Sequence, residues 1–468
     1  MDKNIFKKIS QIVGSKHCTI APEDLHCYSY DASRQTLLPE IVAFPGSSSQ
    51  VADLLRLASE HRFPVIARGA GSGMTGGALP VQGGLILACS RLNRIIEIDQ
   101  ANMIAIVEPG VITGDFQREL RKAGLFYPPD PASLKFCTMG GNVGEGAGGP
   151  SAVKYGVTKD FIMGLEIILA SGEVLHTGTR TEKGVVGYDL TRLFVGAEGT
   201  LGVITKIITR LLPLPEHKET FLITSTALAT ATSLVAEILN RGITPCTLEY
   251  LDRTALRAVA SLLPAPFPPE VEAILILELD GSLEEVKTQR DRLLQLMASA
   301  AHKDCTIEQA ADEEQREQIW RARRAVSPAS YQIAPHKISE DVVVPRTRIP
   351  DLVAFCEEIA REFDLKILTF GHAGDGNLHV NIMHDRDRPG VAQRAEQAKK
   401  RLFLRVIEMQ GTISGEHGIG ITKAPYLGLE LDPVAINTML AIKQLFDPHN
   451  ILNPGKIFPK QLPETKPS

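Results

Sequence analysis

Two glycine-rich segments toward the carboxyl end carry the residues best suited to chemistry. Phe370–His379 reads Phe-Gly-His-Ala-Gly-Asp-Gly-Asn-Leu-His, and Ser414–Gly420 reads Ser-Gly-Glu-His-Gly-Ile-Gly. Imidazole nitrogens and a carboxylate oxygen form a ligand set that suits Zn²⁺ or Mn²⁺. A site with three protein ligands leaves coordination positions open for substrate. The two segments therefore predict a catalytic metal site rather than a structural one.

Each of these histidines, taken alone, would be interpreted as an ordinary structural residue. The pairing of His372 with His379 across a glycine-rich turn changes that interpretation. A strand–turn–strand arrangement can bring the two rings together, whereas the carboxylate has to come from another element. Asp375, inside the turn, is interpreted as a residue that orients the loop.

The composition limits the functions that the chain can have. A length of 468 residues exceeds one ordinary core, so two or three domains are expected. A net charge of −5 gives no electrostatic basis for binding nucleic acid or an anionic membrane. No apolar run reaches the roughly 18–20 residues of a membrane span, and Met1–Asn4 does not begin a signal peptide. We therefore expect a cytoplasmic protein.

The seven cysteines are scattered and never form Cys-x-x-Cys, so neither a zinc ribbon nor an iron–sulfur cluster is predicted. Idle thiols in a reducing cytoplasm are the simpler interpretation. Any redox chemistry must then pass its electrons to something outside this chain.

A first glycine loop, Arg68–Gly77, follows the predicted strand Pro64–Ala67. Consecutive backbone N–H groups in such a loop can bind a pyrophosphate, and glycine permits its close approach. No helix pattern follows directly, so the Rossmann fingerprint is not met, and the absence of Gly-Lys-[Ser/Thr] excludes a P-loop. Alone, the loop could equally be a simple glycine-rich turn.

Two further segments strengthen the prediction of a bound cofactor. Cys137–Pro150 is rich in glycine interleaved with hydrogen-bonding side chains, and Gly196–Thr205 is another glycine-containing segment that leads into a strand. Two long glycine loops in one domain indicate a large, flat, phosphate-bearing cofactor.

The order of predicted elements divides the chain near Pro213–Pro215. Before it, the serines at 47–49 are typical of a helix start, and short apolar strands follow. Beyond it, strands and helices alternate, which indicates a separate α+β domain with an antiparallel sheet. The segment Phe446–Gly455, rich in Asn, Pro and Gly, is expected to be held against the fold.

Together these segments resemble the flavoprotein superfamily of vanillyl-alcohol oxidase and p-cresol methylhydroxylase (PCMH). The nearest branch contains glycolate oxidase flavin subunits, D-lactate dehydrogenases and D-2-hydroxyglutarate dehydrogenases. The resemblance implies an α+β fold with a two-subdomain PCMH-type FAD-binding domain over residues 1–215. It implies a ferredoxin-like α+β cap (substrate) domain over residues 216–440 and a tail, 441–468, that returns to the FAD domain.

The same resemblance implies the residues that would hold FAD. The first loop and the Thr138 segment would bind the pyrophosphate, Ile204 would lie near the adenine, and Asn453 would approach the flavin ring. The implied cofactor-binding residues are Arg68, Gly69, Ala70, Gly71, Ser72, Gly73, Thr138, Gly141, Asn142, Gly148, Gly149, Val203, Ile204 and Asn453. Some relatives tether the flavin to a histidine, but Gly71 occupies that position here, so FAD is expected to be non-covalent.

By resemblance, His372, His379 and Glu416 would bind the divalent metal, and His417 would be the catalytic base. A metal-bound hydroxyl is acidic enough to lose its proton to an imidazole near neutral pH.

The resemblance also assigns the substrate contacts. Arg323, three residues past Trp320, would bind the substrate carboxylate, and Asn381 would also contact the substrate. One charged helix face is the alternative explanation for the arginine segment, and it suffices for Arg316 and Arg321. Lys337 is a weaker match to a family lysine.

The implied reaction is the oxidation of a D-2-hydroxy acid to the 2-oxo acid, with hydride transfer to flavin N5. D-Lactate and glycolate lead the candidates, and D-2-hydroxyglutarate or another larger hydroxy acid is the alternative. An electron-transfer subunit with little activity of its own is a second alternative, and a zinc hydrolase would leave the glycine loops unexplained. The expected partners are an external acceptor, such as an iron–sulfur subunit or an electron-transfer flavoprotein, and a second copy in a homodimer.

Overall fold

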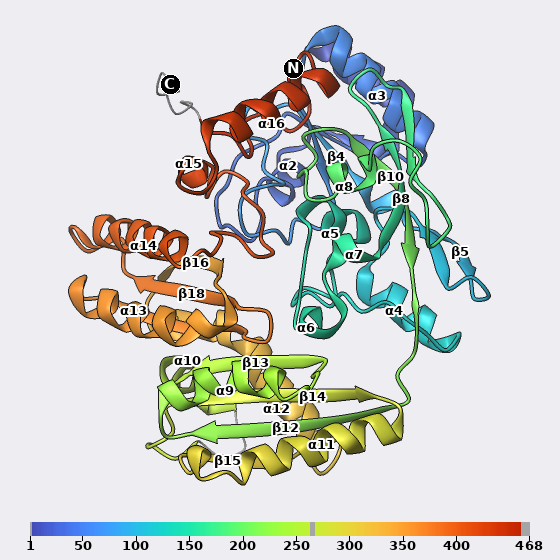
Figure 1. The fold of residues 1–468 in the computed structure, drawn as a ribbon. Helices are drawn as coiled ribbons and strands as arrows, with labels where there is room; N and C mark the ends of the chain where they lie inside the picture. Colours follow the sequence, from blue (N-terminus) through green and yellow to red (C-terminus); the bar gives the residue numbers. More distant parts are fainter. Residues whose placement is uncertain (1, 263–266, 460–468) are drawn as a thin grey trace. The chain divides into compact units, whose positions relative to one another are not determined.

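The computed structural model describes residues 2–262 and 267–459 (Figure 1). Contacts divide the chain into two compact units, which are described in turn. The first unit consists of residues 1–148, 157–214 and 416–468, and the second of residues 149–156 and 215–415. Residues 149–156 and 416–440 thus group differently from the domain ranges expected from the sequence. The last nine residues of the expected tail lie outside the described part.

The first sheet of the first unit forms from short, almost wholly apolar runs. Its strand order is β1-β2-β4-β3, with β2, β4 and β3 parallel and β1 antiparallel to β2. The strands are β1 (Cys18–Thr19), β2 (Ile41–Ala43), β3 (Val65–Arg68) and β4 (Leu85–Ala88). Strands of a parallel sheet are covered on both faces, which explains why every residue of β4 is apolar and buried.

Helix α3 (Ser48–His61) connects β2 to β3 and begins where the serine cluster predicted a helix start. The Ser47 hydroxyl accepts a hydrogen bond from the backbone N–H of Gln50 at 3.3 Å, so it satisfies one free donor of the first turn. Helix α1 (Lys3–Val13) packs against the same core. The buried face of α3 consists of Val51, Ala52, Leu54, Leu55, Leu57 and Ala58.

The second sheet of this unit is antiparallel, in the order β5-β6-β10-β8-β9. Its strands are β5 (Ile95–Asp99), β6 (Ile104–Val107), β8 (Ile162–Ile168), β9 (Val174–Gly178) and β10 (Val203–Arg210). Residues of β10 alternate between buried and half-buried, as in a sheet with one face on the core.

Part of the second glycine segment, expected as an open loop, is helical. Thr138 caps helix α5 (Met139–Glu145) by accepting a hydrogen bond from Gly141 N–H at 3.1 Å, and this cap partly offsets the low helix propensity of the glycines. The other helices and short strands of the unit are α2 (Pro22–Cys27), α4 (Thr113–Lys122), β7 (Leu125–Phe126), α7 (Thr158–Phe161), α8 (Leu190–Phe194), β11 (Leu212–Pro213), α15 (Leu427–Glu430) and α16 (Pro433–Phe446).

The segment after α16 is held along β3. Val65 N–H donates to the carbonyl of Ile451 at 2.7 Å, and Asn453 N–H donates to the carbonyl of Val65 at 2.9 Å. Inside this turn, the Lys443 ammonium forms an ion pair with Asp447 and donates to the carbonyl of Leu452 at 2.9 Å. A late segment of the chain therefore extends the first sheet.

The second unit is built on one antiparallel sheet of seven strands in the order β15-β12-β14-β13-β17-β18-β16. The strands are β12 (His217–Ser225), β13 (Thr247–Asp252), β14 (Ala273–Gly281), β15 (Cys305–Gln309), β16 (His336–Val343), β17 (Lys366–His372) and β18 (Asn377–His384). Strands β12 to β15 with the helices that follow β12 and β14 have the β-α-β-β-α-β order of a ferredoxin-like unit, and residues 253–259 add one further helix between β13 and β14.

Helices cover the strands of this sheet. Those of the second unit are α6 (Ala152–Tyr155), α9 (Leu228–Asn240), α10 (Arg253–Val259), α11 (Leu283–Met297), α12 (Glu313–Ala329), α13 (Ile349–Glu362) and α14 (Val391–Glu408). Trp320 and Val326 of α12 pack with Leu251, Ile276 and Phe370, so α12 covers the sheet face that these strand residues share. Helix α6 joins this unit because Lys154 and Tyr155 both bind Asp280.

The structure also shows the state of the cysteines and whether any described helix could span a membrane. All seven cysteines are free thiols, and five of them are buried. No helix within residues 2–262 and 267–459 combines the length and the apolar character needed to cross a membrane.

Candidate active site

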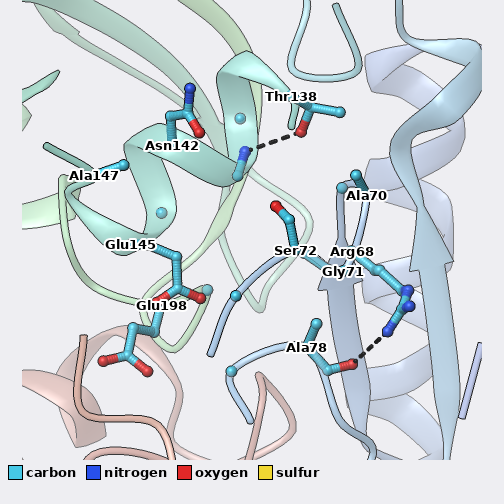
Figure 2. A pocket seen from close by; sticks show the side chains of 18 of the residues that line it. Arg68, Ala70, Gly71, Ser72, Ala78, Thr138, Asn142, Glu145, Ala147 and Glu198 are labelled. Atoms are coloured by element: carbon cyan, nitrogen blue, oxygen red, sulfur yellow. Dashed lines mark hydrogen bonds between the residues drawn. The ribbon is translucent and has the colours of Figure 1, made fainter. Parts of the chain in front are cut away.

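One pocket of the first unit is enclosed by its glycine-rich segments (Figure 2). Residues from 67–78, 131–147 and 198–204 line it, together with Glu416 and His417. The predicted cofactor-binding residues that line it are Arg68, Gly69, Ala70, Gly71, Ser72, Gly73, Thr138, Gly141, Asn142 and Ile204. Four others do not line it, namely Gly148, Gly149, Val203 and Asn453.

The first glycine loop is shaped by two close approaches that only glycine allows. A Cβ on Gly69 would lie 2.3 Å from the hydroxyl oxygen of Thr138. Gly71 has a φ of +67°, and a Cβ there would lie 2.2 Å from Nη2 of Arg68. Among the described residues, none accepts a hydrogen bond from the N–H groups of Ala70, Gly71, Ser72 or Gly73. A run of unused donors in a glycine loop fits the phosphate oxygens of a dinucleotide.

Arg68, at the start of this loop, is held by hydrogen bonds to the backbone on either side of it. Its guanidinium donates to the carbonyl oxygens of Tyr30 at 2.7 Å and Ala78 at 3.4 Å, and it lies 5.6 Å from the ring centroid of Tyr28. The side chain is buried, and burial lowers the pKa of its guanidinium from the ordinary value. Hydrogen bonds within the protein therefore engage much of the Arg68 guanidinium.

Asn142 is likewise bound within the protein. Its side-chain Nδ2 donates to the hydroxyl of Thr113 at 2.8 Å, deep in the unit. This bond fixes α5 to the start of α4 and leaves the amide oxygen and the second Nδ2 hydrogen as the groups that can interact with a ligand.

Two carboxyl groups at this pocket, the half-buried Glu145 and the buried Glu198, were missed in the sequence (Figure 2). Glu198 accepts hydrogen bonds from the backbone N–H groups of Ile419 at 2.7 Å and Gly420 at 2.8 Å. A Cβ on Gly418 would lie 2.6 Å from Oε2 of Glu145 and 3.0 Å from Oε1 of Glu198, so both groups lie against this loop. Burial, together with the neighbouring Glu198, raises the pKa of Glu145 well above its ordinary value.

His417 and Glu416 lie on the loop that Glu198 holds. The carbonyl of His417 accepts a hydrogen bond from the Thr75 hydroxyl at 3.0 Å, which ties the loop to the first glycine segment. Nε2 of His417 is 3.9 Å from Oε1 of Glu416, so the two adjacent side chains are neighbours. A Cβ on Gly148 would lie 2.9 Å from Oε2 of Glu416, so Gly148 lies against this carboxylate although it does not line the pocket.

Asn453 does not line the pocket but binds the backbone of two residues that do. Its Nδ2 donates to the carbonyl oxygens of Gly77 at 2.8 Å and Glu198 at 2.7 Å, and its Oδ1 accepts a hydrogen bond from Lys456 at 2.9 Å. These bonds use both amide hydrogens and one of the two lone pairs of the amide oxygen. The residue joins two of the segments that line the pocket.

In the second unit, a hairpin brings the two predicted metal-binding histidines together. Strands β17 and β18 pair antiparallel, with His372 opposite Asn377 and His379 opposite Phe370. The rings of His372 and His379 are 5.2 Å apart between centroids and nearly perpendicular, at 82°. Both side chains are buried. The turn between them is the glycine-rich segment that the sequence singled out.

The other polar residues of this sheet face follow from the strand register. Asn381, two residues beyond His379, accepts a hydrogen bond from the Ser339 hydroxyl at 2.7 Å, and its Nδ2 has no partner among the described residues. On β16, Asp341 lies opposite His379 and accepts a hydrogen bond from the N–H of Gly415 at 2.8 Å.

Lys337 also belongs to β16. It donates to the hydroxyl of Ser327 at 2.8 Å and lies 4.9 Å from the ring centroid of Tyr331. This lysine therefore has protein partners of its own.

Arg323 projects from α12 and reaches Glu249 on β13, a residue that sequence reasoning missed. Nε of Arg323 donates to Oε2 of Glu249 at 2.5 Å, and Nδ1 of His372 lies 2.5 Å from Oε1 of the same carboxylate. Burial alone would raise the pKa of Glu249, but Arg323 and His372 outweigh it and lower the pKa to about 2. Glu249 is thus ionised and joins the predicted carboxylate-binding arginine to a predicted metal ligand.

The pocket and the sheet face define a flavin-dependent oxidoreductase, and comparison with known families agrees. The model of the FAD binding domain matches residues 39–178, and that of the C-terminal domain of FAD linked oxidases matches residues 214–457. The chain belongs to the FAD-linked oxidase family. The expected fold class, a PCMH-type FAD-binding domain with a C-terminal α+β domain, is confirmed.

Curated relatives and a solved structure agree with this assignment. The glycolate oxidase subunit GlcD of Bacillus subtilis is 41% identical over 98% of this chain and 97% of its own. The D-lactate dehydrogenase of Anaerostipes hadrus is 32% identical over 90% of this chain and 89% of its own. The structure of p-cresol methylhydroxylase superimposes with a TM-score of 0.81, covering 98% of this chain and 97% of that one. At 20% identity, this last likeness concerns the fold alone.

Proposed function

We propose that the protein oxidises a D-2-hydroxy acid, with D-lactate or glycolate as the leading substrates, to the corresponding 2-oxo acid. The observation that carries the proposal is the polar end of the second unit's sheet, where Arg323, His372, His379 and Asn381 are buried on one face. The relatives named glycolate oxidase subunit and D-lactate dehydrogenase support the substrate class. Bound FAD supplies the acceptor for the α-hydrogen as hydride.

Arg323 would hold the substrate carboxylate. Its Nε is bound to Glu249, which leaves the two terminal amino groups for two parallel hydrogen bonds to a carboxylate. The ring centroid of Phe370 lies 5.0 Å from the guanidinium carbon and supports its plane. Asn381 would donate its unused Nδ2 hydrogens to a substrate oxygen.

We propose that His372, His379 and Glu416 hold a divalent cation, Zn²⁺ or Mn²⁺. Such a cation lowers the pKa of a coordinated hydroxyl group. The two imidazoles are already paired on the β17–β18 hairpin. Glu416 directly follows Gly415, whose N–H is bound to Asp341 on β16 opposite His379, so chain connectivity keeps Glu416 close to that strand position.

His417 would accept the proton of the substrate hydroxyl. Its loop is fixed by Thr75 and Glu198, so the imidazole is carried on a backbone that several hydrogen bonds hold in place. An imidazole with an ordinary pKa of about 6.5 accepts protons efficiently near neutral pH.

We further propose that FAD is bound without a covalent link and is reoxidised by an external acceptor. Gly71 has no side chain that could form a bond to the flavin. No cysteine pair has the spacing of an iron–sulfur ligand set. The electrons would therefore leave for an iron–sulfur subunit or an electron-transfer flavoprotein, with molecular oxygen as a poor substitute.

Anaerobic mixing of the oxidised holoenzyme with D-lactate, glycolate and D-2-hydroxyglutarate in turn tests the substrate assignment. Rapid bleaching of the flavin absorbance by D-lactate or glycolate, but not by L-lactate, is the expected result. Bleaching by D-2-hydroxyglutarate alone would move the proposal to the larger hydroxy acids. A lack of bleaching by any 2-hydroxy acid, with dithionite still reducing the flavin, would refute it.

A further inference from the structure

Two buried carboxylates attach α12 to the sheet of the second unit. Glu278 on β14 binds the first half of the helix, through Trp320 at 2.8 Å and Arg316 at 3.1 Å. Glu249 on the neighbouring strand β13 binds Arg323, about two turns beyond Arg316 and one turn beyond Trp320 on the helix. The two glutamates are 3% and 0% exposed, so they are similar in burial and in the element that they hold. They differ in what else they bind.

Glu278 has only structural partners. Besides the two helix residues, it accepts hydrogen bonds from Thr220 at 2.8 Å and Lys218 at 3.1 Å on β12. Glu249 instead divides its two oxygens between Arg323 and Nδ1 of His372, each at 2.5 Å. The carboxylate that reaches the polar end of the sheet is therefore the one that contacts a histidine.

The hydrogen-bonding rules of these groups determine the state of His372. An ionised carboxylate can only accept, so the ring nitrogen facing Glu249 has to carry the hydrogen. That assignment places the hydrogen on Nδ1 and leaves Nε2 of the neutral ring with its lone pair. Nε2 is then the nitrogen that can serve as a ligand or an acceptor.

We propose that Glu249 is a positioning residue that sets the Nδ1–H tautomer of His372, while Arg323 holds the carboxylate in place. The inference deepens the proposed function, because it names the residue that prepares His372 to bind a cation. Partners of this kind typically change metal affinity by roughly 10- to 100-fold when they are removed. Arg323 would then have two roles, binding a substrate carboxylate with its terminal amino groups and anchoring Glu249 with Nε.

The substitution Glu249→Gln gives opposite predictions for a positioning and a merely structural residue. A glutamine has one acceptor and one donor end. The charged Arg323 is the stronger donor and should retain the oxygen, so the amide NH₂ would face Nδ1 of His372. The ring would then move its hydrogen to Nε2 and lose the lone pair needed for a ligand. The matched control is Glu278→Gln, which changes a similarly buried carboxylate that binds the same helix from strand β14 without touching His372.

The test uses the full-length, FAD-loaded, metal-free protein at pH 8, labelled with ¹⁵N-histidine. Two-bond ¹H–¹⁵N correlation spectra report the tautomer of each ring, and His372→Gln identifies the signal. The expected result is Nδ1–H in the wild type and in Glu278→Gln, and Nε2–H in Glu249→Gln. Titration with Zn²⁺ alone should show a 10- to 100-fold weaker affinity in Glu249→Gln only.

Two results would overturn the inference. One is an Nε2–H tautomer for His372 in the wild type. This result can be measured even if the variants fail to fold. The other is an unchanged tautomer and Zn²⁺ affinity in Glu249→Gln. If the wild type binds no Zn²⁺, the proposed metal site fails, yet the tautomer still reports directly on Glu249.

Discussion

Replacing Asn453 with alanine should weaken both the first unit and its hold on FAD, although Asn453 does not line the pocket. The substitution removes two donated hydrogen bonds, to the carbonyls of Gly77 and Glu198, and one accepted from Lys456. Leaving two buried carbonyls without a donor costs roughly 1–3 kcal/mol each. The free energy of unfolding should therefore fall by about 2–6 kcal/mol.

A nearby asparagine provides the control for backbone strain. Asn453 has a φ of +41° and Asn450 a φ of +50°, so both pay a similar penalty as alanine. Asn450 is exposed, and its side chain makes no hydrogen bond with the described residues. The difference between Asn453→Ala and Asn450→Ala therefore measures the side-chain hydrogen bonds.

Thermal unfolding of the FAD-free proteins and titration with FAD, followed by flavin fluorescence, are the assays. A domain of this size loses roughly 2–4 °C of melting temperature per kcal/mol, so Asn453→Ala should melt about 10 °C below Asn450→Ala. Its FAD affinity should also fall at least tenfold, since Gly77 and Glu198 line the pocket. Equal melting temperatures and equal FAD affinities for the two variants would refute the role assigned to Asn453.

Further outcomes follow from other sites. Gly71→Ala should reduce FAD affinity at least tenfold, because a Cβ would lie 2.2 Å from Arg68; Gly124→Ala, at a similar φ of +68° with nothing within 4 Å, should leave titrated FAD affinity unchanged. Acid precipitation should release FAD into the supernatant, and flavin retained on the pellet would indicate a covalent link. Chelation should slow flavin reduction by substrate but not by dithionite, and equal effects would remove the proposed metal. Burial raises the pKa of Asp252 from 3.8 to about 6, so its folded form keeps a proton that the unfolded chain has lost. Raising the pH from about 4 to 6 should then lower the stability of the wild type relative to Asp252→Asn by roughly 2 kcal/mol, and parallel melting curves across this range would contradict that pKa.

Local signals in the sequence were sufficient for many elements. The serine cluster predicted the start of α3, and the glycine-rich turn between His372 and His379 predicted a strand pair that β17 and β18 form. The resemblance of the glycine loops to the PCMH superfamily predicted the fold class correctly. Side chains of Thr138 and Arg68 approach the backbone so closely at Gly69 and Gly71 that these positions favour glycine. Each of these features is visible in the residue types of a short segment of the sequence.

The missed residues depend on partners that are far apart in the chain. Glu249 lies in the strand Thr247–Asp252, between the apolar residues Leu248 and Tyr250. Such a polar residue between apolar neighbours suggests a side chain exposed to solvent, yet α12 covers that face of the sheet. Its partners, Arg323 and His372, are 74 and 123 residues away. Asn453 was predicted as a cofactor-binding residue, but its hydrogen bonds to the distant carbonyls of Gly77 and Glu198 could be identified only from the tertiary structure.

The division of the first unit along the sequence has a consequence for biosynthesis. Residues 1–148 and 157–214 leave the ribosome well before the segment from Glu416, which supplies His417, the residues paired with β3 and Asn453. Domains usually fold as units as the chain is synthesised, amino-terminal parts first. Here the second unit has to be translated before the pocket can close. Nascent chains that stall before Glu416 should therefore be unable to retain flavin, and cofactor loading should be a late step in the maturation of this enzyme.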